Sequence, residues 1–173
     1  MLKKIILTIL IVLSITPVYA KSGVNIFTYP REVPDVKIFD RHGKAVSLKE
    51  FKGNFLIVVF WSKTCIPCIR EIDDINNFIR KTKGTDIKII TVSPEKDWTS
   101  IEEHRAFLKK YNGLNIDFYS DRQSTLANNF GIFTSPHTVL INKKSMEIGR
   151  IRGSVDWDDN DVIEYIYKLK AEH

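Results

Sequence analysis

The chain has 173 residues, of which 43% are hydrophobic, and its 26 basic and 21 acidic side chains give a formal net charge of +5. A chain of this length encloses one substantial core, so we expect a single domain. The positive charge is modest and scattered, with no groove-reading motif beside it, which argues against a protein that binds nucleic acid.

Residues 1–20 have the anatomy of a secretory signal peptide. Lys3 and Lys4 precede an apolar segment at 5–15, and Val18-Tyr19-Ala20 resembles the small-x-Ala pattern of a cleavage site. The apolar segment is shorter than the roughly 20 residues that span a bilayer. We therefore expect cleavage after Ala20 and a periplasmic protein, with an uncleaved membrane anchor as the alternative.

The first part of the mature chain predicts an extended lead-in and a hairpin. Residues 21–33 show little periodicity, and we assign them to the lead-in and residues 34–173 to the domain. Alternating Val36 and Ile38 before the polar segment 40–44 predict a hairpin. Ser47 and Glu50 form a capping-box pattern for a short helix, and the apolar run 55–61 predicts a strand buried on both faces.

The middle of the chain alternates between helices and strands. Isoleucines at helical spacing predict a helix over 68–80, and residues 87–92 form a second apolar strand. Ser100 and Glu103 form another capping-box pattern, for a helix that ends at Asn112-Gly113. This order implies parallel strands with right-handed crossovers, so the fold class is α/β.

The last third predicts two more short elements, a hairpin and a terminal helix. Residues 116–119 and 121–129 are assigned to a strand and a helix, and 138–141 and 148–151 to the strands of the hairpin. The final helix starts near 158 and has a core face of Val162, Ile163, Ile166 and Leu169.

Cys65 and Cys68 are the only cysteines, and they lie between the strand at 55–61 and the helix that follows. Unpaired N–H groups and the helix dipole favour negative charge there, so the thiol of Cys65 is expected to ionise more easily than a free cysteine. A disulfide that closes so short a loop adds little stability, and one Cys-x-x-Cys supplies half of a four-ligand zinc cage. The pattern predicts disulfide exchange, with a structural disulfide and a metal site as alternatives.

Four segments in this order resemble the thioredoxin fold, and within it the exported TlpA-like group of ResA- and DsbE-like thiol:disulfide oxidoreductases. They are SLKEFKGNFLIVVFWSKTCIPC, ITVSPEKD, GIFTSPHTVLINK and GRIRGSVDW. The resemblance implies a central mixed sheet with helices on both faces and an N-terminal hairpin extension.

Four residues are assigned to catalysis. Cys65, at the helix start, is the expected nucleophile, and Cys68 resolves the mixed disulfide. By resemblance, Pro136 is a cis proline that lies against the disulfide, and Glu71 is the acidic residue of a Cys-x-x-Cys-x-x-Glu pattern that exchanges a proton with Cys68. The plainer alternative for Glu71 is an exposed helix charge or an ion-pair partner of a nearby basic residue.

Four further residues are assigned to substrate binding. The backbone of Ser135 is expected to pair with an extended chain. Trp61, Ile66 and Pro67 surround the cysteines in the sequence and are expected to shape the contact. The resemblance also has a departure, because Val59 stands where general thioredoxins carry a buried aspartate.

The resemblance implies a periplasmic reductase of disulfides in exported proteins such as apocytochrome c. A membrane thiol electron-transfer protein is the expected electron donor, and we expect a monomer or weak dimer without metal or organic cofactor. Two alternatives remain open. One is a polypeptide-binding assembly factor with a structural disulfide, and the other is a copper carrier that uses both thiols and His137.

Overall fold

The computed structural model describes residues 23–173, so the predicted signal peptide lies outside the described residues. Eight strands form one mixed sheet in the order β1-β8-β7-β4-β5-β6-β2-β3. The elements in chain order are β1 (Gly23–Glu32), β2 (Lys37–Phe39), β3 (Ala45–Ser47), η1 (Leu48–Phe51), β4 (Phe55–Phe60), α1 (Ile66–Lys81), β5 (Ile87–Pro94), η2 (Glu95–Asp97), α2 (Ile101–Lys110), β6 (Asp117–Asp121), η3 (Arg122–Ser124), α3 (Thr125–Phe130), β7 (His137–Ile141), β8 (Met146–Arg152) and α4 (Asn160–Glu172).

Strand β4 lies at the centre of the sheet, and all its residues are buried, as its unbroken apolar run predicts. It pairs in parallel with β5 and antiparallel with β7. The parallel pairing continues from β5 to β6, which confirms the α/β class. Because α1 follows β4 after a short loop, Cys65 at the end of this loop and Cys68 in the first turn of α1 lie at the carboxyl end of the central strand.

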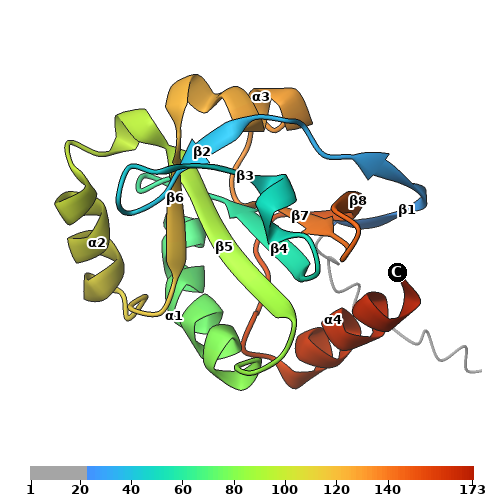
Figure 1. The fold of residues 1–173 in the computed structure, drawn as a ribbon. Coiled ribbons are helices and arrows are strands. Elements are labelled where there is room, and N and C mark those ends of the chain that lie inside the picture. The colour runs from blue at the N-terminus through green and yellow to red at the C-terminus, as the bar shows by residue number, and fades with distance from the viewer. Residues whose placement is uncertain (1–22) are drawn as a thin grey trace, which may run out of the picture.

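Helices cover both faces of the sheet (Figure 1). One hydrophobic core contains apolar side chains of α1, α2 and α4, with Ile72 and Phe78 of α1 fully buried. The other core contains Leu48 of η1 and Leu126 and Phe130 of α3. Alternate residues of β4 point into opposite cores, so this strand is the shared centre of both.

The predicted lead-in forms strand β1, which pairs antiparallel with β8 at one edge of the sheet. Its register is interrupted between Ile26 and Arg31, where the strand bulges away from its partner. Gly149 of β8 makes the close approach possible, since a Cβ atom there would lie 2.6 Å from Ile26 Cδ1 and 2.8 Å from the carbonyl oxygen of Asn25.

Of the two predicted capping boxes, the first is complete and the second is only half formed. Ser47 and Glu50 form the complete box, although the helix they open is a 3₁₀ turn. At the start of α2, the Ser100 hydroxyl accepts the N–H of Glu103. The Glu103 carboxylate, however, accepts the N–H of Thr99 and contacts Lys63. The second box is therefore only half formed, because Thr99 and Lys63 bind its carboxylate in place of the Ser100 N–H.

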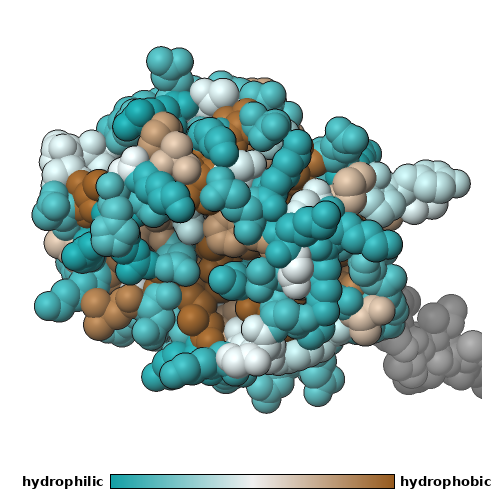
Figure 2. Space-filling model, viewed as in Figure 1, coloured by the Kyte–Doolittle hydropathy of each residue, from teal (hydrophilic) through white to brown (hydrophobic). Residues whose placement is uncertain are grey.

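Polar side chains cover most of the face seen in Figure 2, and apolar atoms form only small patches there. Within residues 23–173, none of the helices combines the length and the hydrophobicity required to cross a lipid bilayer.

Candidate active site

Cys65 and Cys68 form a disulfide at the start of α1. Cys65 is the N-cap residue, and its Sγ atom accepts the backbone N–H of Cys68 at 3.3 Å. Pro67 occupies the first turn, where a missing N–H leaves no intrahelical hydrogen bond unmade. In the reduced protein, the same N–H and the helix dipole would stabilise negative charge on Cys65.

The two sulfur-bearing residues differ in exposure. Cys65 is half-buried, whereas only 2% of Cys68 is exposed. An incoming thiol or disulfide therefore reaches Cys65 first, and Cys68 faces the core beneath it. This asymmetry suits the predicted roles of Cys65 as the attacking residue and Cys68 as the resolving residue.

Glu71 lies one helical turn after Cys68 and is 4% exposed. Its carboxylate accepts the backbone N–H of Val155, from the segment between β8 and α4. The pKa of Glu71 is raised to about 7, mainly by burial and to a smaller degree by the nearby charge of Asp74, while the Val155 hydrogen bond opposes the shift. The alternative of an exposed helix charge is wrong, and Lys63 pairs with Glu103 instead.

Ser135 and Pro136 precede β7, and the peptide bond between them is cis. Ser135 is exposed, while Pro136 is buried. An exposed backbone segment that leads into a strand can accept hydrogen bonds from, and donate them to, another chain. The structure thus places Ser135 where its predicted contact with substrate is sterically possible.

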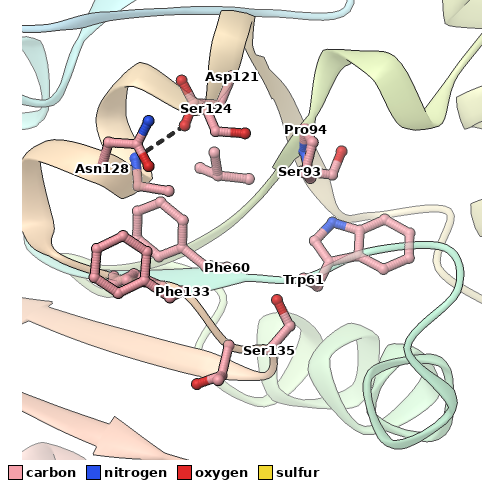
Figure 3. A pocket seen from close by; sticks show the side chains of 13 residues that line it. Phe60, Trp61, Ser93, Pro94, Asp121, Ser124, Asn128, Phe133 and Ser135 are labelled. Carbon is pink, nitrogen blue, oxygen red and sulfur yellow. Dashed lines mark hydrogen bonds between the residues drawn. The ribbon is translucent and has the colours of Figure 1, made fainter.

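Trp61 and Ser135 both line a surface cavity of about 230 Å³ (Figure 3). Phe60 and Phe133 supply its apolar wall. Asp121 lies at its polar end, where its carboxylate accepts the N–H of Ala127 at 2.9 Å, drawn as a dashed line in Figure 3. Its remaining lining residues are Val92, Ser93, Pro94, Ser124, Ala127, Asn128, Ile132 and Thr134.

The predicted contact residues differ in exposure. Ile66 is 64% exposed and Pro67 is also exposed, so both present apolar surface next to Cys65. Trp61 is 3% exposed and packs in the core behind the loop. Phe133 is 83% exposed, and sequence reasoning did not select it. An aromatic residue three positions before a proline in a loop carries no distinctive sequence pattern.

His137, named above as a ligand of the alternative copper carrier, is buried at the start of β7. Burial and the charges of Arg150 and Arg152 lower its pKa to about 4, so it is neutral at pH 7. In the part of the chain that the structure describes, no three His, Cys, Asp or Glu side chains gather in a geometry that could hold a metal ion.

A helix-capping disulfide with one accessible sulfur, placed on this sheet, defines the class of the protein as a thioredoxin-like thiol-disulfide oxidoreductase. Residues 30–165 match the AhpC/TSA family, and the chain belongs to that family.

Named relatives agree with this class. The thiol-disulfide oxidoreductase ResA of Bacillus thuringiensis subsp. konkukian is 27% identical over 139 residues, which cover 80% of this chain and 77% of that protein. ResA of Geobacillus kaustophilus is 27% identical over 126 residues, covering 73% of this chain and 70% of the relative.

Solved structures share the fold. A thiol:disulfide interchange protein of Chlorobium tepidum superimposes with a TM-score of 0.65 at 19% identity, covering 83% of this chain and 98% of that one. StoA of Bacillus subtilis superimposes with a TM-score of 0.60 at 22% identity, covering 80% of this chain and 98% of the other.

Proposed function

We propose that this oxidoreductase is exported and reduces disulfides in particular extracytoplasmic proteins, of which apocytochrome c is one candidate. The observation that carries the proposal is the pairing of an accessible sulfur at Cys65 with a buried sulfur at Cys68, one helical turn from the buried carboxyl group of Glu71. Such a site is equipped for a two-step exchange in which the enzyme becomes oxidised.

The first step is attack by Cys65. Its thiolate forms a bond to one sulfur of the substrate disulfide, and the other substrate sulfur leaves as a thiolate that takes up a proton. Ile66 and Pro67 are exposed beside the attacking sulfur and offer apolar contact to the substrate. The backbone of Ser135 pairs with the substrate chain and aligns its disulfide with Cys65.

The second step is resolution by Cys68. Its thiol gives its proton to the Glu71 carboxylate, and the resulting thiolate attacks Cys65, releasing the second substrate sulfur as a thiol. A carboxyl group with a pKa of about 7 can accept and return a proton near neutral pH. The products are the enzyme disulfide and the substrate dithiol, so two electrons and two protons pass to the substrate.

Regeneration requires a dithiol donor that reduces the Cys65–Cys68 disulfide in turn. A membrane thiol electron-transfer protein is the proposed donor, because an oxidising compartment does not supply enough reducing thiols itself. Export is supported by the signal-peptide pattern of residues 1–20. Reduction as the direction is supported by the resemblance to the TlpA-like group.

Two measurements test the proposal. Equilibration with a glutathione buffer gives the reduction potential, which we expect near that of thioredoxin, roughly −270 mV, whereas a value near −120 mV would mark a strong oxidant and overturn the direction. A Cys68→Ala variant then traps mixed disulfides with exported proteins through Cys65. Cys65→Ala/Cys68→Ala is the matched control, and equal recovery from both would contradict disulfide-specific capture.

A further inference from the structure

The loop that leads into Cys65 carries a lysine that is held away from the helix α1 N-terminus. Lys63 lies two residues before Cys65, and its backbone N–H donates to Asp97 Oδ2 at 3.2 Å. Its Nζ atom lies 2.8 Å from Glu103 Oε1 and 5.2 Å from the centre of the Trp98 ring. The ammonium group is therefore directed toward α2.

Glu103 is held in place by several contacts. Its Oε2 atom accepts the N–H of Thr99 at 2.7 Å and the Thr99 hydroxyl at 2.8 Å, while its own N–H donates to Ser100. The hydrogen bond from Lys63 and the two from Thr99 lower the pKa of Glu103 to about 2, so it is charged at pH 7. The Glu103 carboxylate is thus a charged group in a fixed position that can bind the Lys63 ammonium.

The element that carries Glu103 is itself fixed to the active-site loop by aromatic packing. His104 stacks on Trp98 with ring centres 3.9 Å apart and planes 5° apart. Trp98 in turn lies 5.6 Å from Trp61, the first residue of the loop. The position of Glu103 relative to the cysteines is therefore set by packing and does not depend on the ion pair.

The ion pair contributes little to folding. The side chains of Lys63 and Glu103 are 30% and 37% exposed, and partly exposed pairs of this kind typically add less than about 1 kcal/mol. Lys63 nevertheless stands only two residues before Cys65, whose ionisation governs exchange. An unpaired lysine at this position would favour the Cys65 thiolate.

We propose that Glu103 is a positioning residue that holds the Lys63 ammonium on α2 and so keeps its charge from stabilising the Cys65 thiolate. The reduced form is favoured less than it would be with a free lysine, and the enzyme is a stronger reductant as a result. The inference concerns the redox balance of the cysteine pair, so it is independent of the identity of the substrate.

The test is the equilibrium of full-length Glu103→Gln with glutathione at pH 8. In that reaction, the enzyme disulfide and two glutathione thiols give the enzyme dithiol and one glutathione disulfide. We expect the equilibrium constant to rise about threefold or more, the scale expected when one charge acts over roughly 10 Å between protein and water dielectric. An unchanged constant would overturn the proposal.

A second pair of variants separates positioning from the direct field of the carboxylate. If Glu103 acts by holding Lys63, Glu103→Gln has no effect on the equilibrium constant in a Lys63→Gln background. If the effect is the same in both backgrounds, Glu103 acts by its own charge and the positioning role is wrong. Asp97, the other acid that contacts Lys63, is unchanged in all four proteins.

Glu102→Gln is the matched control, since Glu102 is the preceding residue of α2, is exposed and lies outside the Lys63 ion pair. We expect its equilibrium constant to equal that of the wild type, and a rise as large as that of Glu103→Gln would overturn the proposal. Failure of the wild type to exchange with glutathione would instead refute the oxidoreductase activity, on which the inference depends.

Discussion

At the scale of single residues, the buried carboxyl group of Glu71 affects both the proposed proton transfer and the stability of the fold. Only 4% of Glu71 is exposed, and its carboxylate accepts a hydrogen bond from the backbone N–H of Val155. Burial is the main reason that the pKa of Glu71 rises to about 7, and the charge of Asp74 contributes to the rise. The group is therefore poised to move a proton at neutral pH, at a cost to folding.

Replacing Glu71 with glutamine should slow resolution of the mixed disulfide. Glutamine keeps the shape of the side chain but cannot accept the Cys68 proton, so we expect a loss of about 10²-fold or more. Rapid-quench measurement of mixed-disulfide decay tests this. The wild-type rate should rise with pH through about 7, where Glu71 loses its proton, and the variant should lack that rise. A variant that retains it would contradict the proton-transfer role.

The same substitution should stabilise the oxidised protein at alkaline pH. Glu71 has a folded pKa of about 7 against 4.5 for the unfolded chain, so the folded state binds more protons between these values. Stability therefore falls as pH rises through this window, by about 3 kcal/mol in total. Urea unfolding should show Glu71→Gln more stable by about 1–3 kcal/mol at pH 8, with the difference vanishing near pH 4. Destabilisation at pH 8 would refute the shifted pKa.

The cysteine pair and the Glu71 spacing can be recognised from sequence because they depend on neighbours within one helical turn. The tertiary contacts of Glu71 and Lys63 cannot be recognised in this way. Val155 is 84 residues from Glu71 and contributes a backbone N–H, which every residue except proline has. Glu103 is 40 residues from Lys63, and its sequence pattern predicts a capping box, so only the tertiary structure reveals the ion pair.

At the scale of elements, α2 and η2 form the support of the active-site loop. His104 of α2 is 1% exposed and is enclosed by the rings of Trp98, Phe118 and Trp61. Burial lowers the pKa of His104 to about 3, because its charged form would lose its hydration. The packing of this support is therefore sensitive to acid.

Replacing His104 with phenylalanine should reduce the acid sensitivity of folding. Below pH 6.5 the unfolded histidine binds a proton that the folded one does not, so stability falls as pH drops toward 3. This group alone should cost about 2–3 kcal/mol between pH 7 and pH 4.5. Thermal unfolding of His104→Phe should lose that share of the pH dependence and keep a similar share from His137 over the same pH range. An unchanged pH profile would contradict a neutral buried His104.

Element types follow from periodicity in most of the chain, since β4, α1, β5 and α4 bury regular apolar faces. The lead-in is the informative exception. Most of β1 is exposed, so it lacks the alternation of apolar residues that identifies a half-buried strand. Its strand conformation comes from pairing with β8, and local sequence does not report a partner so distant in the chain.

At the scale of the whole molecule, the redox site and the edge of the sheet are separate. The central strand β4 leads to the cysteines, while β1 lies at the far edge, beyond β7 and β8 (Figure 1). The docking of β1 requires the missing side chain of Gly149. A substitution that displaces β1 should therefore change the structure only at this edge of the sheet and leave the disulfide chemistry unchanged.

A Gly149→Ala substitution tests this separation. The new Cβ atom would lie 2.8 Å from the backbone oxygen of Asn25, so β1 must shift, at a cost of about 1–3 kcal/mol. Limited proteolysis should cleave residues 23–32 faster, while the glutathione equilibrium stays at the wild-type value. Gly23→Ala is the control, because its Cβ would make an ordinary 3.7 Å contact with Arg152 Cβ. Equal proteolysis of both variants would contradict the argument.

If Cys65 is an accessible, acidic nucleophile with Cys68 held beneath it, the two thiols of the reduced protein must differ in reactivity. The most direct test is the pH dependence of iodoacetamide alkylation of the reduced protein, with the modified residue identified by peptide mass. We expect Cys65 to react first, with an apparent pKa clearly below the value of about 8.5 for a free cysteine, and Cys68 to react much more slowly. Preferential labelling of Cys68, or a Cys65 no more acidic than a free thiol, would contradict the account.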